Sequence, residues 1–176
     1  YYNFSAGGYA TLPQDFSMLE PGMEPTKIND HTLILNLQHN FSSDWKLTAQ
    51  TAYFNYNRQG SSMWPASLDQ KGNMVRYVSI GDAINEMKFG QLFVNGKAQT
   101  GNVSHRILAG FDAGDKHAWY DWSQMHYLDS TNTYNIYNSS YIPGKPYYGY
   151  PKFDRTKSLK ERANNTQVSQ SYVGIY

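Results

Sequence analysis

The sequence contains no cysteine, which excludes a disulfide scaffold, a thiolate metal site and a cysteine nucleophile. Charged residues are scarce, at 16% against about 25% in a typical soluble domain. The 15 basic and 14 acidic side chains leave a formal net charge of +1, which argues against a strongly basic nucleic-acid-binding protein. No apolar run approaches the roughly 18 residues of a membrane-spanning helix. Membrane-spanning strands carry a much weaker signal, so a membrane location stays open.

Aromatic side chains are abundant and make up 16% of the 176 residues. Tyrosine is the commonest aromatic residue, with 16 copies. Apolar and polar residues alternate along several segments, as in strands that present one apolar and one polar face. This alternation predicts strands over about 31–41, 45–57, 86–98, 103–122 and 166–176. A shorter strand is expected over 74–80, and 157–163 is the only segment with a helical pattern.

The lengths of the connections carry further information. The turns at 42–44 and 99–102 are short, whereas the connections over about 59–85 and 125–165 are long and polar. Outer-membrane barrels have short periplasmic turns, long extracellular loops and strands of about ten residues. The sequence therefore predicts an all-β fold, an antiparallel up-and-down meander that forms part of such a barrel and carries long extracellular loops.

Three segments resemble the TonB-dependent outer-membrane siderophore receptors of the ferrichrome type. They are NFSSDWKL over 40–47, TGNVSHRILAGFD over 100–112 and QSYVGIY over 170–176. The second is the most specific, and the order and spacing of all three agree with the family. The resemblance covers about residues 20–176 and implies an internal part of a 22-stranded barrel in the bacterial outer membrane.

The resemblance also implies partners. They are a ferric siderophore or similar chelate, outer-membrane lipid, and TonB only through parts of the parent chain that this sequence lacks. We see no plug domain and no C-terminal assembly signal, the chain begins Tyr1-Tyr2-Asn3-Phe4 without methionine, and Tyr176 lies within an expected strand. We therefore expect residues 1–176 to be a barrel segment of a longer protein, whose open strand edges seek partners when it is isolated.

Five aromatic residues are the candidate ligand contacts at the outer mouth of this barrel. Flat aromatic faces offer a large contact area at low entropy cost, and the resemblance implies that such rings help to hold the iron chelate. The alternative is an interfacial girdle that anchors the barrel at the level of the lipid headgroups. The candidates lie at or near strand ends: Trp64, Tyr77, Trp119, Tyr120 and Trp122.

The remaining polar patterns indicate no cofactor, no metal site and no enzyme. The five histidines have no recognisable ligand spacing, and no nucleophile or phosphate-binding motif is present. One basic run could attract an acidic siderophore or lipopolysaccharide phosphates, or could simply be a solvated loop. It contains Lys152, Arg155, Lys157, Lys160 and Arg162.

A second function also fits the composition. A soluble β-sheet module that binds carbohydrate or another ligand on an aromatic platform would equally explain the tyrosines and tryptophans. The two hypotheses differ in which residues face lipid. The barrel hypothesis assigns to the lipid Leu33, Leu35, Leu37, Leu47, Ala49, Val103, Ile107, Ala109 and Phe111.

Overall fold

The structure, a computed structural model, describes residues 12–137, 141–163 and 166–176. The expected all-β fold is confirmed, because the described residues form two antiparallel sheets and a single four-residue helix. The described chain divides into two compact units. We call residues 28–58, 83–120 and 163–176 the strand unit, and residues up to 27 with 59–82 and 121–162 the loop unit.

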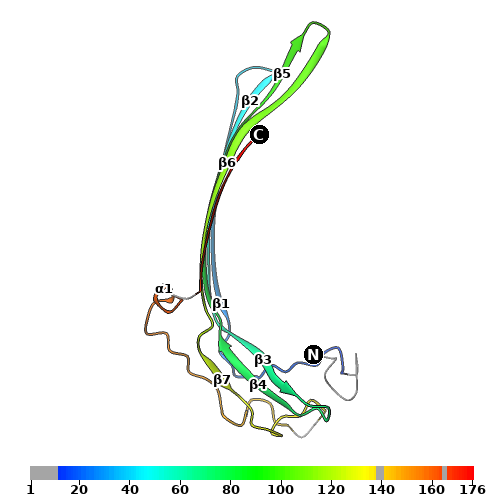
Figure 1. The fold of residues 1–176 in the computed structure, drawn as a ribbon, viewed down its shortest axis with the longest axis vertical. Helices are drawn as coiled ribbons and strands as arrows, with labels where there is room; N and C mark the ends of the chain where they lie inside the picture. Colours follow the sequence, from blue (N-terminus) through cyan, green and yellow to red (C-terminus); the bar gives the residue numbers. More distant parts are fainter. Residues whose placement is uncertain (1–11, 138–140, 164–165) are drawn as a thin grey trace. The chain divides into compact units, whose positions relative to one another are not determined.

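The strand unit is one five-stranded sheet in the order β1-β2-β5-β6-β8. Figure 1 labels four of its strands, β1, β2, β5 and β6. Its strands overlap the five expected segments, although β1 begins near 27 rather than 31 and β5 near 82 rather than 86. The bounds are β1 (Lys27–Asn40), β2 (Trp45–Gln59), β5 (Asp82–Thr100), β6 (Val103–Asp121) and β8 (Gln167–Ile175). Neighbours in the sheet follow chain order, so this part is a meander in which the residues between β2 and β5 do not join the sheet.

Two short turns join strands at the same end of this sheet. Between β1 and β2, the backbone N–H of Phe41 donates to the carbonyl of Trp45 at 3.0 Å, and the Ser42 hydroxyl accepts from the N–H of Asp44 at 3.2 Å. Between β5 and β6, Gly101 has a φ of 59°, a left-handed conformation that glycine adopts without steric penalty. This backbone conformation explains why glycine follows Thr100 in the TG pair of this turn.

The register of β2 against β5 sorts the side chains onto two faces. Leu47 lies opposite Val94 and Ala49 opposite Leu92, and we call the face that carries these pairs the apolar face. The opposite face carries the polar pairs Lys46–Asn95 and Gln50–Gln91, with Phe89 and Phe93 beside them. We call it the polar face. The alternation within β5 is ambiguous in the sequence, and the pairing with β2 resolves it.

The apolar face continues onto β6 and β8. Tyr176 exchanges two backbone hydrogen bonds with Gly110 on β6, and its hydroxyl accepts a hydrogen bond from Gln91 on β5 at 2.9 Å. Tyr176 therefore lies on the polar face, and its neighbour Ile175 lies on the apolar face. Ile175 pairs with Phe111, and Val173 pairs with Ala113. Ile175 and Val173 remain 85% and 75% exposed, because no second layer of the described strand unit packs on them.

Trp45 has a packing role at the short-turn end of the sheet. It lies directly opposite Gly96, and a Cβ at Gly96 would lie 2.3 Å from the Trp45 ring. The indole therefore covers a position where any side chain would clash. Such aromatic cover over a strand glycine restores part of the packing that the glycine lacks.

The loop unit contains a separate three-stranded sheet in the order β3-β4-β7. Its strands are β3 (Ser61–Leu68), β4 (Met74–Ile80) and β7 (Met125–Tyr127). The segment expected as a connection over 59–85 thus holds a hairpin, of which the sequence predicted the second strand. The register shifts between Pro65 and Ser67, which is a β-bulge. A bulge is a position in a strand that accepts proline, because proline has no backbone N–H to donate.

One face of this small sheet is buried and forms the core of the loop unit. Val78 and Ile80 on β4 have no exposed surface, and Met63 on β3 packs with Val78 and Leu128. A second cluster joins Met74 with Tyr134 and Ile136. Residues from 12 to 23 and from 141 to 153 pack around both clusters. In the described residues, no helix is long and apolar enough to cross a membrane.

Candidate functional site

Arg76 is the centre of a buried polar cluster in the loop unit. Its guanidinium forms a bidentate ion pair with Asp129, with Nε to Oδ2 at 2.6 Å and Nη2 to Oδ1 at 2.8 Å. It also donates to the Glu20 carboxylate, to the Met18 carbonyl at 3.1 Å and to the Tyr141 hydroxyl at 3.0 Å. The side chains of Arg76, Glu20 and Asp129 are each 1% exposed. One side chain thus holds three chain segments to strand β4.

The cluster is fully hydrogen-bonded, which a buried charge requires. Burial alone would lower the pKa of Arg76, but the hydrogen bonds to Asp129 and Tyr141 and the charge of Asp129 raise it above its ordinary value. The guanidinium carbon lies 3.5 Å from the centre of the Tyr134 ring, a cation–π contact. Burial and the hydrogen bond to Glu20 raise the pKa of Tyr141 to about 12. The arginine is therefore permanently charged, and the tyrosine is neutral at physiological pH.

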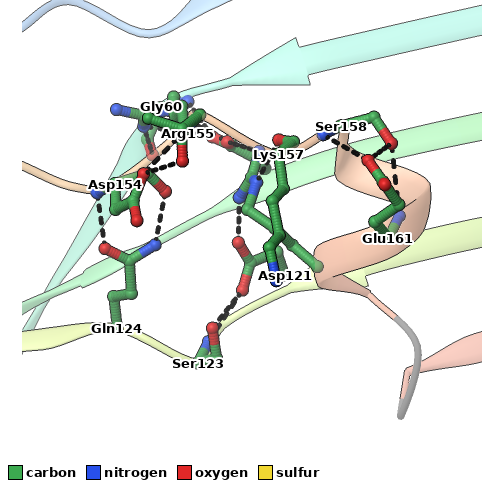
Figure 2. A network of polar contacts seen from close by, with 12 residues as sticks. Gly60, Asp121, Ser123, Gln124, Asp154, Arg155, Lys157, Ser158 and Glu161 are labelled. Carbon is green, nitrogen blue, oxygen red and sulfur yellow. Dashed lines mark hydrogen bonds and ion pairs between the residues drawn. The ribbon is translucent and has the colours of Figure 1, made fainter.

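A second network of hydrogen bonds and ion pairs in the loop unit centres on Asp82 and Asp121. Figure 2 shows Asp121, Gly60 and Arg155 of this network. Arg155 donates to Asp82 through Nε at 2.9 Å and to the carbonyl of Gly60 at 3.1 Å. Arg162 donates to Asp82 at 2.9 Å and also to Asp121. The backbone N–H of Gly60 donates to Asp82 at 3.0 Å. The residues that follow β2, begin β5 and end β6 are thereby tied to segment 151–162.

The charge state of Asp82 follows from these contacts. Burial by itself would raise its pKa, but hydrogen bonds from Arg155, from the Gly60 N–H and from Arg162 outweigh burial and lower it. The carboxylate is therefore ionised at any physiological pH, and both arginines have a permanent partner.

Helix α1 (Leu159–Arg162) carries one of these arginines, and a capping box starts it. Ser158 donates through its hydroxyl to Glu161 at 2.6 Å, and Glu161 accepts from the Ser158 N–H at 2.9 Å. Figure 2 shows this pair beside the Asp121 network, together with Gln124. The Gln124 side chain bonds the backbone of Asp154 in both directions, at 2.7 and 2.6 Å. The S-x-x-E spacing is a sequence signal for the start of this helix.

The arginines of the basic run are therefore structural in this arrangement. Arg155 and Arg162 are 20% and 12% exposed and pair with acidic side chains of the same unit. Their guanidinium groups donate to Asp82, Asp121 and the carbonyl of Gly60. Neither of the two interpretations of this run anticipated an internal role, because the partners Asp82 and Asp121 are 41 to 80 residues away in the chain.

Three aromatic side chains cross the exposed face of the three-stranded sheet in one line. Trp64 on β3 lies opposite Tyr77 on β4, and Tyr77 lies opposite Tyr127 on β7. The Tyr77 and Tyr127 ring centres are 6.2 Å apart. Trp64 and Tyr127 are 43% and 46% exposed. We call these three residues the aromatic row, and it is the candidate ligand-binding surface.

The five predicted contact residues divide between the two units. Trp64 and Tyr77 lie in the aromatic row, and Trp122 follows β6 in the loop unit with 55% of its surface exposed. Trp119 and Tyr120 lie at the end of β6 in the strand unit, where Trp119 pairs with Gln167. The Trp119 ring stacks on His117 with centres 5.9 Å apart, and the Tyr120 hydroxyl donates to Asn85 at 2.9 Å.

Sequence reasoning missed Tyr127 as a member of the row. Its strand has three residues, too short for a periodic pattern, and only the pairing of β7 with β4 aligns it with Trp64 and Tyr77. In the described ranges, no group of three or more histidine or acidic side chains is placed to hold a metal ion. Comparisons with protein-family models, with curated proteins and with solved structures gave no match.

Removing the Asp129 carboxylate should destabilise the loop unit strongly. We expect Asp129→Ala to cost about 3–5 kcal/mol, because it leaves the buried Arg76 charge without its bidentate partner. Denaturant unfolding monitored by aromatic circular dichroism measures this change. Asp15→Ala, at an exposed carboxylate of the same unit, is the control and should change stability by less than about 0.5 kcal/mol. Equal unfolding midpoints for the two variants would contradict the central role of Arg76.

The Asp82 network should open in acid. A carboxylate whose folded pKa is lowered stabilises the fold above its ordinary pKa, and this stability is lost as the pH falls through the folded value. We expect the Nε–H resonances of Arg155 and Arg162 to shift together in an NMR titration below about pH 4, near the ordinary pKa of aspartate. In Asp82→Asn this shared transition should vanish. Its persistence in that variant would show that another group controls the network.

Proposed function

We propose that this chain supplies barrel wall and extracellular loops to an outer-membrane receptor for the TonB-dependent uptake of ferric siderophores. The observation that carries the proposal is the exposed apolar face of the five-stranded sheet. In the half nearer the short turns its cross-strand pairs are apolar on both strands, as in Leu47–Val94 and Phe111–Ile175, whereas toward the long connections the same face carries polar pairs such as Asn55–Glu86 and Asp115–Ser171. Exposure of these apolar side chains to water is unfavourable in free energy, whereas contact with lipid chains removes that penalty.

The positions of the connections support the same proposal. Trp45 pairs with Gly96 next to the two short turns, whereas Arg58 pairs with Ala83 where the long connection between β2 and β5 begins and ends. Trp119 pairs with Gln167 at the corresponding place between β6 and β8. Short turns at one end of a sheet and long connections at the other are typical of the periplasmic and extracellular sides of an outer-membrane barrel.

The packing of the loop unit also fits an extracellular role. Long loops without internal structure are uncommon, and those that bind ligands are held by a scaffold. Here Arg76 and Asp82 hold the long connections through networks of hydrogen bonds and ion pairs. This arrangement supports a rigid mouth, in which aromatic side chains such as Trp64 and Tyr77 have defined positions for a chelate.

The facing of the sheet can be tested directly, because the chain has no cysteine of its own. Single cysteines at Ala49 and Leu92 sample the apolar face, and matched cysteines at Gln50 and Gln91 sample the polar face one residue away. With a polarity-sensitive fluorophore on each cysteine in lipid vesicles, we expect brominated lipid to quench the first pair and aqueous iodide the second. Equal access of iodide to all four positions would contradict a barrel wall and favour a soluble ligand-binding module.

Siderophore binding can be tested by tryptophan fluorescence, because the chain has four tryptophans that can be kept one at a time. A variant that keeps only Trp119 should show saturable quenching by ferrichrome, because Trp119 lies at the end of the sheet that bears the long connections. A variant that keeps only Trp45 is the matched control, since the rise per strand residue places it roughly 40 Å away, beside the short turns. Quenching that is equal in both variants, or absent from both, would contradict the proposed ligand or its location.

A further inference from the structure

The aromatic row borders an open hollow on the surface of the loop unit. The hollow has a volume of about 520 Å³ and is walled by two exposed tyrosines, Tyr127 from β7 and Tyr148 from the connection that follows. The backbone N–H of Tyr148 donates to the carbonyl of Leu128 at 3.0 Å, which holds Tyr148 next to β7. Val75, Ser130 and Thr131 also line it, together with Asp129 and His126. The row and the hollow therefore form one continuous surface.

The lining of this surface carries no unpaired charge among its described residues. Asp129 reaches the hollow, but both of its carboxylate oxygens are bound to Arg76. His126, the other titratable group at the hollow apart from the tyrosines, shares a hydrogen bond of 3.1 Å with the carbonyl of Gly149. What remains for a ligand is aromatic faces and hydroxyl groups. A charged partner would find no countercharge on this surface, so the complementary ligand is neutral.

We propose that the aromatic row and the hollow bind a neutral oligosaccharide chain. A sugar ring presents C–H groups on its faces and hydroxyls around its edge. The C–H groups fit the negative faces of aromatic rings, and the hydroxyls pair with those of Ser130, Thr131 and the tyrosines. The row crosses three strands, which gives it a length of about 10 Å, so it accommodates more than one linked ring. This site does not depend on a ferric ligand and goes beyond the transport role.

The placement of the rings supports saccharide binding over burial in a protein interface. Trp64, Tyr127 and Tyr148 are 43%, 46% and 53% exposed, and the ion pairs beneath them fix the backbone that carries them. Rigid aromatic rings on a fixed sheet provide contact area with little loss of side-chain entropy. The flanking hydroxyls and the open shape suit a ligand that keeps much of its surface in water.

The test is calorimetric titration of the full chain with three neutral oligosaccharides: maltohexaose, cellohexaose and chitohexaose. We expect at least one to bind, and Tyr148→Ala to weaken that binding about tenfold, equivalent to about 1.4 kcal/mol. Tyr148→Phe, which keeps the ring, should retain most of the affinity. Tyr137→Ala is the matched control, because Tyr137 is a 46% exposed tyrosine of the same unit and does not line the hollow, whereas the Tyr147 ring packs against Tyr148 with centres 4.8 Å apart.

Three results would overturn the proposal. They are the absence of binding by all three oligosaccharides, an equal loss of affinity in Tyr137→Ala and Tyr148→Ala, and unchanged binding when Tyr127 and Tyr148 are both replaced by alanine. Ferrichrome quenching is measured separately on the same variants. A chain that binds ferrichrome but no oligosaccharide contradicts only the saccharide site, whereas the reverse result contradicts only the siderophore role.

Discussion

The buried guanidinium of Arg76 is the contact on which the loop unit depends. A charge in this position is tolerated only when every donor has an acceptor, and four residues from three chain segments supply them. Those segments include residues 18–20, 129 and 141, which have no strand of their own to hold them. The same contact supports β4 from beneath, so the opposite face of that strand can present Tyr77 to solvent with defined neighbours.

The strand unit depends on a different constraint, the strict alternation of side chains along a β-strand. A single register between β2 and β5 assigns every residue of both strands to a face. The result is a face whose pairs are apolar on both strands near the short turns, as in Leu47–Val94. On the opposite face, the Tyr176 hydroxyl accepts a hydrogen bond from Gln91. The two units thus use two kinds of stabilisation. The apolar face of the five-stranded sheet has no covering layer among the described residues of the strand unit. The three-stranded sheet of the loop unit packs against its own core.

Local patterns predicted the parts of the fold in which one face of a strand is uniform over many residues. The alternation from Leu33 to Leu37 and from Val103 to Phe111 indicated long strands, and the short turns between them were recognisable from their composition. The strand at 61–68 was not predicted, because Pro65 and the bulge beside it interrupt the alternation. For the candidate site, Trp64 and Tyr77 were selected as individual aromatics. Their alignment with Tyr127 was not predictable, since a three-residue strand has no period.

The all-β class, the long strands and the abundance of aromatic side chains could be predicted before any coordinates, because these follow from residue type and from periodicity within one segment. Which residues of distant segments contact one another became clear from the folded structure. Arg76 finds Glu20 and Asp129, which are 56 and 53 residues away, and Asp82 finds Arg155 and Arg162 at 73 and 80. The physical reason is that ion pairs and cross-strand pairs depend on separation in space, and a local pattern holds no information about which distant segment completes them.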